Sequence, residues 1–365
     1  MLLRKSDHES AKLRTTPQHR GAEGTTVPKT APSLAALPKI VSLFSGAGGL
    51  DLGFCQQGFV VPLAIDFSTA AIQTHQRNFK DTHGVVADLV KLGPSGVLGL
   101  VTSTIPRGER IGIIGGPPCQ GFSRGNPNSR IDDPRNELPA LYIQIVRSLR
   151  KHYTVDFVVF ENVLGMKDRK HLPTFHALLA DLKGLQFEVT ENELCSLEFG
   201  VPQNRRRIIL TSMRNGLECE LPLPKKRKGP VTVKDAIGGL PDPVFFARGL
   251  SSTEFPVHPN HWTMKPKSKR FTNPVVVSGG RSFRRLSWDK PSPTIAFGHR
   301  EIHVHPEGRR RLSIYEAMIL QGFPKSFVLE GNLSEQVEQI SNAVPPPLAT
   351  SIAAAVKTAL TKVSV

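Results

Sequence analysis

Short aliphatic runs that stop abruptly at loops of glycine, proline or acidic residues recur through the first half of the chain. The sharpest is Ile111–Ile114, which ends in residues 115–123, Gly-Gly-Pro-Pro-Cys-Gln-Gly-Phe-Ser. A continuous apolar run of this kind predicts a strand that is buried on both faces of a parallel sheet. Because the carboxyl ends of parallel strands share one edge, the loops should gather there. The pattern therefore predicts a doubly wound α/β fold with its functional groups at that edge.

Two units at the start of this pattern have the features of a nucleotide site. Residues 39–44 predict a strand that runs into a Ser-Gly-Ala-Gly-Gly turn and a helix, which would direct backbone N–H groups at a nucleotide. An ordinary tight turn is the alternative. The next predicted strand, residues 60–65, ends at Asp66 and Phe67, which offer acceptors for ribose hydroxyls and a face for adenine, although Asp66 could instead cap the following helix. Asp88 ends a third short strand, so we expect it at the same edge.

Cys119 lies on a loop that the sequence makes stiff. The two prolines before it restrict the backbone, and the flanking glycines let a ligand approach closely. These features suit a nucleophile. The competing interpretation is an inert core residue, because free cysteine is among the most buried residue types.

Two more chemical groups follow in predicted strands. Glu161 ends the apolar run of residues 155–160, and a carboxylate partly desolvated in the sheet crevice could hold a proton or hydrogen bond near neutral pH. Arg205 and Arg207 share one face of a predicted strand, so two guanidinium groups could point into the same crevice. A capping or ion-paired role for Glu161 and a solvated strand edge for the arginines are the alternatives.

The charge of the chain points to a polyanionic partner. The formal net charge is +16 and the pI is near 9.9, for which nucleic acid is the simplest physical use. Basic residues that merely solvate the surface are the alternative. The distribution favours a partner, because residues 212–283 carry twelve Lys and Arg against five Asp and Glu. Residues 1–38 are polar and aperiodic and predict a flexible basic tail.

The cysteine, histidine and apolar patterns argue against several classes. The four cysteines include no Cys-x-x-Cys pair, so neither a zinc site nor a disulfide framework is expected. His299, His303 and His305 lie near one another in the sequence, but no partner cluster of metal ligands accompanies them, which argues against a metal. No apolar run reaches the roughly 18 residues that span a bilayer, and no secretory segment opens the chain. We therefore expect a soluble cytoplasmic protein, nucleoid-associated if bacterial, with no metal and no membrane partner.

Taken in order, the motifs from about Ile40 to Val356 resemble those of the DNA (cytosine-5)-methyltransferases, S-adenosylmethionine-dependent enzymes of restriction-modification type. Every catalytic motif of that family has a match, and further matches lie at residues 285–295, 320–324 and 341–347. The resemblance implies an α/β, doubly wound, Rossmann-like methyltransferase sheet with a smaller, basic target-recognition domain. The implied divisions are a flexible tail (1–38), a catalytic cofactor-binding domain (39–222), a target-recognition domain with its hinge (223–334) and a C-terminal segment that returns to the catalytic domain (335–365).

The resemblance also implies a role for each matching residue. The catalytic residues would be Cys119, Glu161, Arg205 and Arg207. S-adenosyl-L-methionine would contact Phe44, Ser45, Gly46, Gly48, Asp51, Asp66, Phe67, Asp88, Pro118, Asn342 and Val344. Duplex DNA would contact Gln120, Ser123, Arg124, Gln203, Arg248, Lys267, Arg270, Arg281 and Arg284.

In the implied reaction, Cys119 adds to C6 of a cytosine flipped out of duplex DNA, C5 accepts the methyl group, and S-adenosyl-L-homocysteine is the product. The implied protein is a monomer that protects DNA in a restriction-modification system, with a cognate endonuclease acting separately. A catalytically silent relative should have lost Cys119 or the cofactor glycines, and a nicotinamide oxidoreductase would explain neither Cys119 nor the basic insert. A tRNA cytosine-5 methyltransferase remains the alternative, because one branch of the family acts on RNA.

Overall fold

The computed structural model describes most of the chain outside its ends and several loops. The described residues are 36–118, 121–122, 134–214, 217, 219–221, 229–247, 249, 255–272, 283–294 and 303–362. Ala36–Val365 form one compact unit, and this unit is not divided at residue 222 or 334. The domain boundaries expected at those two positions therefore stay predictions. The predicted tail lies almost wholly outside the described residues.

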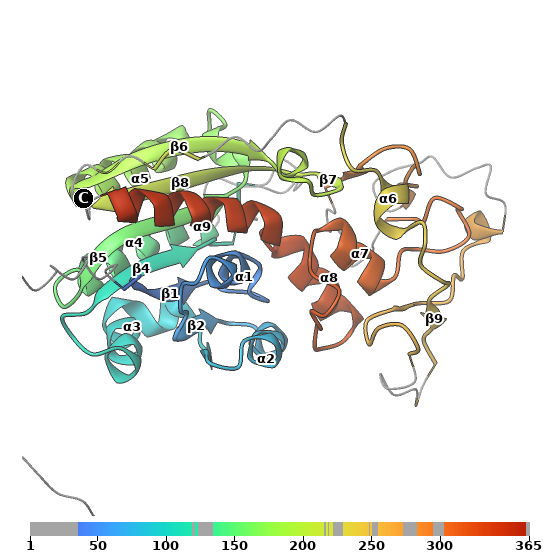
Figure 1. The fold of residues 1–365 in the computed structure, drawn as a ribbon, viewed down its shortest axis with the longest axis horizontal. Helices are drawn as coiled ribbons and strands as arrows, with labels where there is room; N and C mark the ends of the chain where they lie inside the picture. Colours follow the sequence, from blue (N-terminus) through green and yellow to red (C-terminus); the bar gives the residue numbers. More distant parts are fainter. Residues whose placement is uncertain are drawn as a thin grey trace, which may run out of the picture. The chain divides into compact units, whose positions relative to one another are not determined.

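A sheet of seven strands forms the centre of this part of the chain, in the order β3-β2-β1-β4-β5-β8-β6 (Figure 1). β3, β2, β1, β4 and β5 are parallel to one another, whereas β8 pairs with both β5 and β6 in the antiparallel sense. The predicted α/β sheet is confirmed, and the loops after β1, β2, β4 and β5 meet at its carboxyl edge. The strands are β1 (Lys39–Leu43), β2 (Leu63–Asp66), β3 (His83–Val86), β4 (Arg110–Gly115), β5 (Thr154–Asn162), β6 (Phe187–Cys195) and β8 (Arg206–Arg214).

One predicted strand begins later than expected. The sequence places a strand over residues 60–65, but β2 starts at Leu63 and includes Asp66. Val60 lies outside the strand and is 56% exposed, although its carbonyl still accepts from the Ile40 N–H. Pro62 has no N–H to donate to a neighbouring strand, which explains why regular pairing begins after it.

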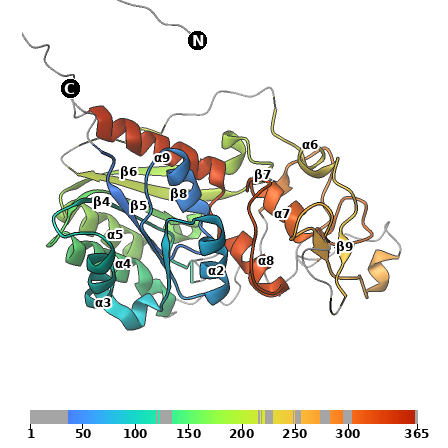
Figure 2. The ribbon, with the colours of Figure 1, turned by 60° about the horizontal axis from the view of Figure 1, so that its bottom comes forward.

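Helices cover both faces of the sheet, and α9 lies across one of them (Figure 2). Side chains alternate along each strand, so Val41 and Leu43 enter the core with α3, α4 and α5, whereas Ile40 enters the core with α1 and α9. A Cβ on Gly53 of α1 would lie only 2.3 Å from the backbone of Ala349, so glycine is what lets α9 approach α1. The helices are α1 (Gly49–Gln56), α2 (Thr69–Asn78), α3 (Leu89–Thr104), α4 (Leu138–Leu149), α5 (Leu172–Gly184) and α9 (Pro346–Thr361).

The segment between β8 and α8 (Leu333–Asn342) has only short regular elements in its described residues. Trp262, which is 8% exposed, belongs to a core cluster that this segment shares with α8 and with residues near the turn after β1. We call residues 223–334, which the resemblance predicts to hold the target-recognition domain, the recognition segment. Its elements, with the short strand β7 that pairs with β11, are β7 (Gln203–Asn204), α6 (Val233–Ile237), β9 (Val244–Phe245), β10 (Trp262–Thr263), β11 (Ser292–Pro293) and α7 (Ile314–Leu320).

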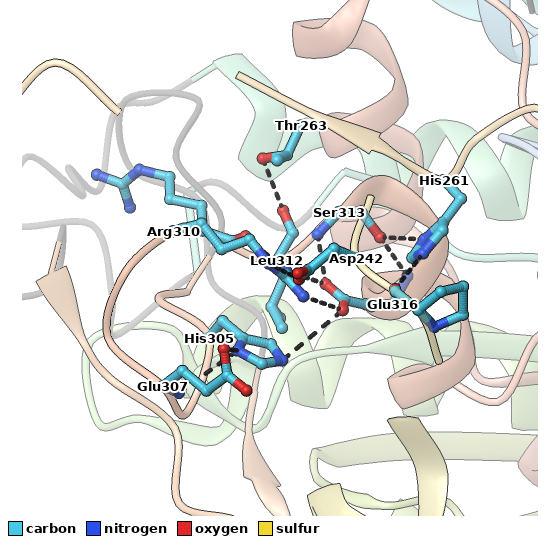
Figure 3. A network of polar contacts seen from close by, with 11 residues as sticks. Asp242, His261, Thr263, His305, Glu307, Arg310, Leu312, Ser313 and Glu316 are labelled. Atoms are coloured by element: carbon cyan, nitrogen blue, oxygen red, sulfur yellow. Dashed lines mark hydrogen bonds and ion pairs between the residues drawn. The ribbon is translucent and has the colours of Figure 1, made fainter. Parts of the chain in front are cut away.

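A buried polar network fastens the start of α7 to other parts of the recognition segment (Figure 3). Arg310 donates to both carboxylate oxygens of Glu316, at 2.8 and 2.9 Å. The Ser313 hydroxyl accepts from the Glu316 N–H, and the Glu316 carboxylate accepts from the Ser313 N–H, which caps α7. His261, next to β10, lies 3.0 Å from the Ser313 hydroxyl and 2.9 Å from the Pro241 carbonyl. The Glu316 carboxylate therefore joins α7 to Arg310 and Ser313 in the loop that precedes the helix.

His258, in the same segment, makes the stability of the fold depend on pH. Its ring stacks on Tyr315 at 4.1 Å, and its Nδ1 accepts from the Asn260 N–H. Burial lowers the pKa of His258 from 6.5 to about 4. The unfolded chain therefore binds a proton that the folded chain does not, and the free energy of unfolding should fall as the pH drops from 6.5 toward 4.

The variant His258→Phe keeps the ring stack but cannot titrate, so we expect a shallower loss of stability with falling pH. Part of the slope should persist, because burial also lowers the pKa values of His303 and His305. Urea unfolding at about pH 7 and about pH 5 measures both proteins. Equal losses in the two proteins would contradict the assignment to His258.

Candidate active site

A cavity opens at the carboxyl edge of the sheet, and stretches far apart in the sequence line it. They come from the turn after β1, the end of β2, the loops after β4 and β5, the β7–β8 region and α8. The lining includes the following residues that the sequence predicts for the site: Phe44, Ser45, Gly46, Asp51, Asp66, Phe67, Pro118, Glu161, Arg205, Arg207, Asn342 and Val344.

The turn after β1 is packed so closely that only glycine fits at two positions. Gly48 caps α1 with φ at 91°, and a Cβ there would meet the Phe79 ring at 2.5 Å. A Cβ on Gly49 would lie 2.4 Å from the Val344 carbonyl oxygen. The start of α1 therefore lies against the C-terminal part of the chain at the cavity wall. Its free N–H groups and helix dipole favour an anionic group there.

Asp66 joins the end of β2 to that turn. Its Oδ2 accepts from the Gly46 N–H and its Oδ1 accepts from the Ser68 N–H, both at 2.9 Å. Ser68, rather than Asp66, caps α2. Burial raises the pKa of the Asp66 carboxyl, the two N–H donors oppose this shift, and the Glu338 carboxylate adds to it. Asp66 keeps free lone pairs at the cavity, and Phe67 beside it is 62% exposed.

Asp51 is held by a histidine that the sequence did not single out. Asp51 lies in the first turn of α1, and its Oδ1 is 3.2 Å from Nε2 of His75 in α2. Both side chains are fully buried, and the His75 ring stacks on Phe79 at 4.2 Å. The pair fixes the carboxylate at the edge of the cavity. A single histidine within a helix belongs to no motif, so the sequence carries no signal for this role.

Glu161 and Arg207 meet in the cavity wall. Nε of Arg207 lies 2.9 Å from Oε1 of Glu161, and the side chains are 11% and 8% exposed. A Cβ on Gly116, in the loop after β4, would lie 2.7 Å from Oε2 of Glu161, so glycine leaves the space that the carboxylate occupies. Asn162 donates from Nδ2 to the Pro117 carbonyl at 3.3 Å, which fastens the same loop to β5. Glu161 is therefore ion-paired and also faces the crevice, so the two interpretations are compatible.

Arg205 and Arg207 both reach the cavity, as alternation along the strand predicts, whereas Arg206 is exposed. Arg205 is 1% exposed and donates from Nη2 to the Ser341 carbonyl at 2.8 Å. It therefore connects the β7–β8 region to the end of α8. Gln203 in β7 is fully buried, and its amide has no hydrogen-bond partner within the described residues.

Some predicted site residues lie elsewhere. Asp88 accepts from the Val90 N–H at 3.0 Å as the cap of α3, and neither Asp88 nor Gly48 is among the residues that line the cavity. Three predicted DNA contacts are exposed in the recognition segment, namely Lys267, Arg270 and Arg284. The remaining predicted site residues lie outside the described residues, namely Cys119, Gln120, Ser123, Arg124, Arg248 and Arg281.

The cavity also has a wall that the sequence did not predict. It comes from α8, which contributes Glu335, Glu338, Gln339 and Ser341. The Glu335 carboxylate accepts from the Asn332 N–H as part of the α8 cap, whereas Glu338 is exposed and influences Asp66. Helical spacing in α8 marks its buried face but not which polar residues reach a distant strand end. The sequence therefore named only the end of α8, with Asn342 as a cofactor contact and Ser341 as part of the motif at residues 341–347.

Comparison with known proteins decides the family. The sequence model of the family of C-5 cytosine-specific DNA methylases matches residues 38–358 of this chain. The chain belongs to this family. This methyltransferase is 33% identical to Type II methyltransferase M.MthTI of Methanothermobacter thermautotrophicus, over 87% of this chain and 96% of that protein. It is 31% identical to Type II methyltransferase M.NgoPII of Neisseria gonorrhoeae, over 88% and 96%.

A solved structure agrees with this assignment. A chain described as a DNA modification methyltransferase encoded within an E. coli prophage is 27% identical, with a TM-score of 0.72 over 89% of this methyltransferase and 99% of that chain. The predicted family and enzyme class, DNA (cytosine-5-)-methyltransferase, are confirmed.

The family implies S-adenosylmethionine as methyl donor, and the cavity fits that molecule. Asp66 offers acceptors for ribose hydroxyls, Phe67 an exposed ring for adenine, and the start of α1 a place for a carboxylate. No cluster of three His, Cys, Asp or Glu side chains suited to a metal occurs among the residues the structure describes. Within the same residues, no helix is both long and apolar enough to cross a membrane.

Proposed function

We propose that this methyltransferase flips a cytosine out of a specific duplex DNA site and methylates C5 through a covalent bond between Cys119 and C6. The observation that carries the proposal is the meeting of Glu161 and Arg207 in one cavity with Pro118 and the turn after β1. Pro118 directly precedes Cys119 in the sequence. A nucleophile, a carboxylate and a cofactor site would thus converge on one base.

The residues would divide the chemistry as follows. C5 of cytosine is a poor nucleophile, so the Cys119 thiolate would first add to C6. Glu161 would hydrogen-bond the N3 and N4 edge and hold a proton at N3, while Arg207 would orient the base and offset the developing charge. The bound cofactor supplies an electrophilic methyl group. After C5 is methylated, loss of its proton and breakage of the C6–sulfur bond would release the Cys119 thiolate.

The cofactor would be held by residues that line the cavity. Asp66 would accept from the ribose hydroxyls, with Phe67 stacked on the adenine. The remaining contacts would come from Phe44, Ser45, Gly46, Asp51, Pro118, Asn342 and Val344, which all line the cavity. Base flipping would cost about a few kcal/mol, which contacts to DNA must offset.

Duplex DNA is the substrate we propose, in a restriction-modification system with a separate endonuclease. The support comes from the sequence relatives, which are named Type II methyltransferases, and from the basic residues of the recognition segment. In this proposal residues 223–334 form the target-recognition domain and its hinge, and the enzyme acts as a monomer. A tRNA substrate has less support, because no comparable observation favours it.

Transfer of a tritiated methyl group from S-adenosylmethionine to matched amounts of duplex DNA and tRNA tests the proposal. We expect label in the DNA at cytosine C5, and inhibition by added S-adenosylhomocysteine. Label confined to tRNA would refute the DNA assignment. Label at a position other than C5 would refute the chemistry.

A further inference from the structure

Arg270, in the recognition segment, is held more firmly than an exposed cation usually is. It lies in the short 3₁₀ turn Lys269–Phe271, and the Ser268 hydroxyl accepts from its N–H at 3.3 Å. Its guanidinium carbon is 4.7 Å from the centre of the Phe283 ring, which is within cation–π range. Both its backbone N–H and its guanidinium therefore have a partner, although the residue is exposed.

A small separate core supports the Phe283 ring. Phe271, Val304 and Phe283 pack together, with the two phenylalanine rings 5.8 Å apart. Arg311 approaches the same rings, at 5.1 Å from Phe283 and 5.8 Å from Phe271. Both guanidinium groups thus lie beside one ring, and the exposed one, Arg270, can donate to a ligand rich in hydrogen-bond acceptors.

The neighbouring cations are arranged differently. Lys265, Lys267 and Lys269 are exposed, and within the described residues their ammonium groups make no ion pair and no contact with an aromatic ring. A flexible ammonium is sufficient for a phosphate, which requires charge but no particular plane. Guanine presents O6 and N7 in one plane, and a flat guanidinium can donate to both. An arginine held against a ring, with exposed lysines around it, therefore suits base recognition better than its neighbours do.

We propose that Arg270 reads a guanine of the recognition sequence through O6 and N7 in the major groove, with Phe283 as the positioning residue that holds its guanidinium. The inference rests on the proposed function, since it takes duplex DNA as the substrate. Arg270→Lys keeps the charge but loses the planar fork. Phe283→Tyr keeps the ring, and Phe283→Leu removes it.

The test methylates a pool of duplex DNA of random sequence, and bisulfite sequencing then reads the bases around each methylated cytosine. For Arg270→Lys and Arg270→Ala, discrimination at a single guanine position should fall by about 10- to 100-fold while the other positions keep theirs. Phe283→Leu should lower discrimination at the same position by a smaller factor. Phe283→Tyr, which keeps the ring, should discriminate there as well as the wild type does. As a matched control, Lys267→Ala should lower methylation of all sequences alike and reduce the salt slope by about one.

Two results would overturn the inference. One is a uniform loss in Arg270→Ala with the reduced salt slope of Lys267→Ala, which would assign Arg270 to a phosphate. The other is an unchanged sequence profile in both Arg270 variants. Thermal unfolding of each variant identifies any that fail to fold, and Arg270→Lys leaves the backbone cap in place. If the wild-type enzyme methylated no DNA in the pool, the proposed function itself would fail.

Discussion

Replacement of Cys119 by serine is expected to lower kcat for methyl transfer by about 10,000-fold or more. A serine hydroxyl is almost never ionised at neutral pH, whereas a thiol, with an ordinary pKa of about 8.5, readily supplies the thiolate that addition to C6 requires. Tritium transfer to duplex DNA measures the rate. DNA that contains 5-fluorocytosine has no proton to lose at C5, so it should trap the wild-type chain covalently and leave Cys119→Ser free.

The other cysteines provide the control for this experiment. Burial raises the pKa of the Cys55 thiol to about 12 and that of the Cys219 thiol to about 11, so both remain thiols at neutral pH. Neither residue lines the cavity. Cys55→Ser should therefore keep most of the transfer rate and still be trapped. Equal incorporation by Cys119→Ser and Cys55→Ser would exclude thiolate addition by Cys119.

The sheet could be predicted from the sequence because burial on both faces leaves a simple pattern. β4 is a continuous apolar run closed by glycines and prolines, and its observed bounds nearly coincide with that run. β2 was placed three residues too early, because Val60 and Val61 look equally apolar. Apolar character alone does not show that Pro62 interrupts the pairing of a strand.

Site residues that lie at the ends of strands could be predicted from the sequence, whereas most site residues that lie within helices could not. Glu161 and Arg207 follow from strand ends and strand alternation, and the structure brings them to 2.9 Å. Asp66 has two expected roles that the sequence could not separate, and the structure gives the cap to Ser68. His75 reaches the site through tertiary packing alone, so no local pattern announces it.

Removal of the Glu316 carboxylate should destabilise the protein by about 3–5 kcal/mol, the largest stability effect we expect. Glu316 is 1% exposed and Arg310 is 7% exposed, so Glu316→Gln leaves a guanidinium charge buried. The remaining acid near it is Asp242, at 3.3 Å, whose side chain is 86% exposed and largely hydrated. The same change weakens the cap of α7, because the Ser313 N–H donates to that carboxylate. Urea unfolding near neutral pH gives the free energy.

A surface ion pair is the matched control for this prediction. Arg147 lies 3.2 Å from Asp181, but the two side chains are 52% and 45% exposed. Asp181→Asn should therefore cost under about 1 kcal/mol, because water screens the pair and replaces the lost contact. Similar small losses for Asp181→Asn and Glu316→Gln would show that the buried pair contributes no more than a surface one.

A double variant separates the cost of an unpaired charge from the cost of lost packing. Arg310→Met with Glu316→Gln removes the buried cation together with its partner, so it should lose less stability than the two single variants added together.

The loss of the Glu316 carboxylate should also affect the cofactor site. Gln321, which follows α7, donates to the Ala343 carbonyl at 2.7 Å, and Ala343 lines the cavity. S-adenosylhomocysteine should therefore bind Glu316→Gln more weakly than it binds Asp181→Asn in calorimetric titrations. Unchanged affinity in a destabilised Glu316→Gln would show that the Glu316 network stabilises the recognition segment without supporting the cofactor wall.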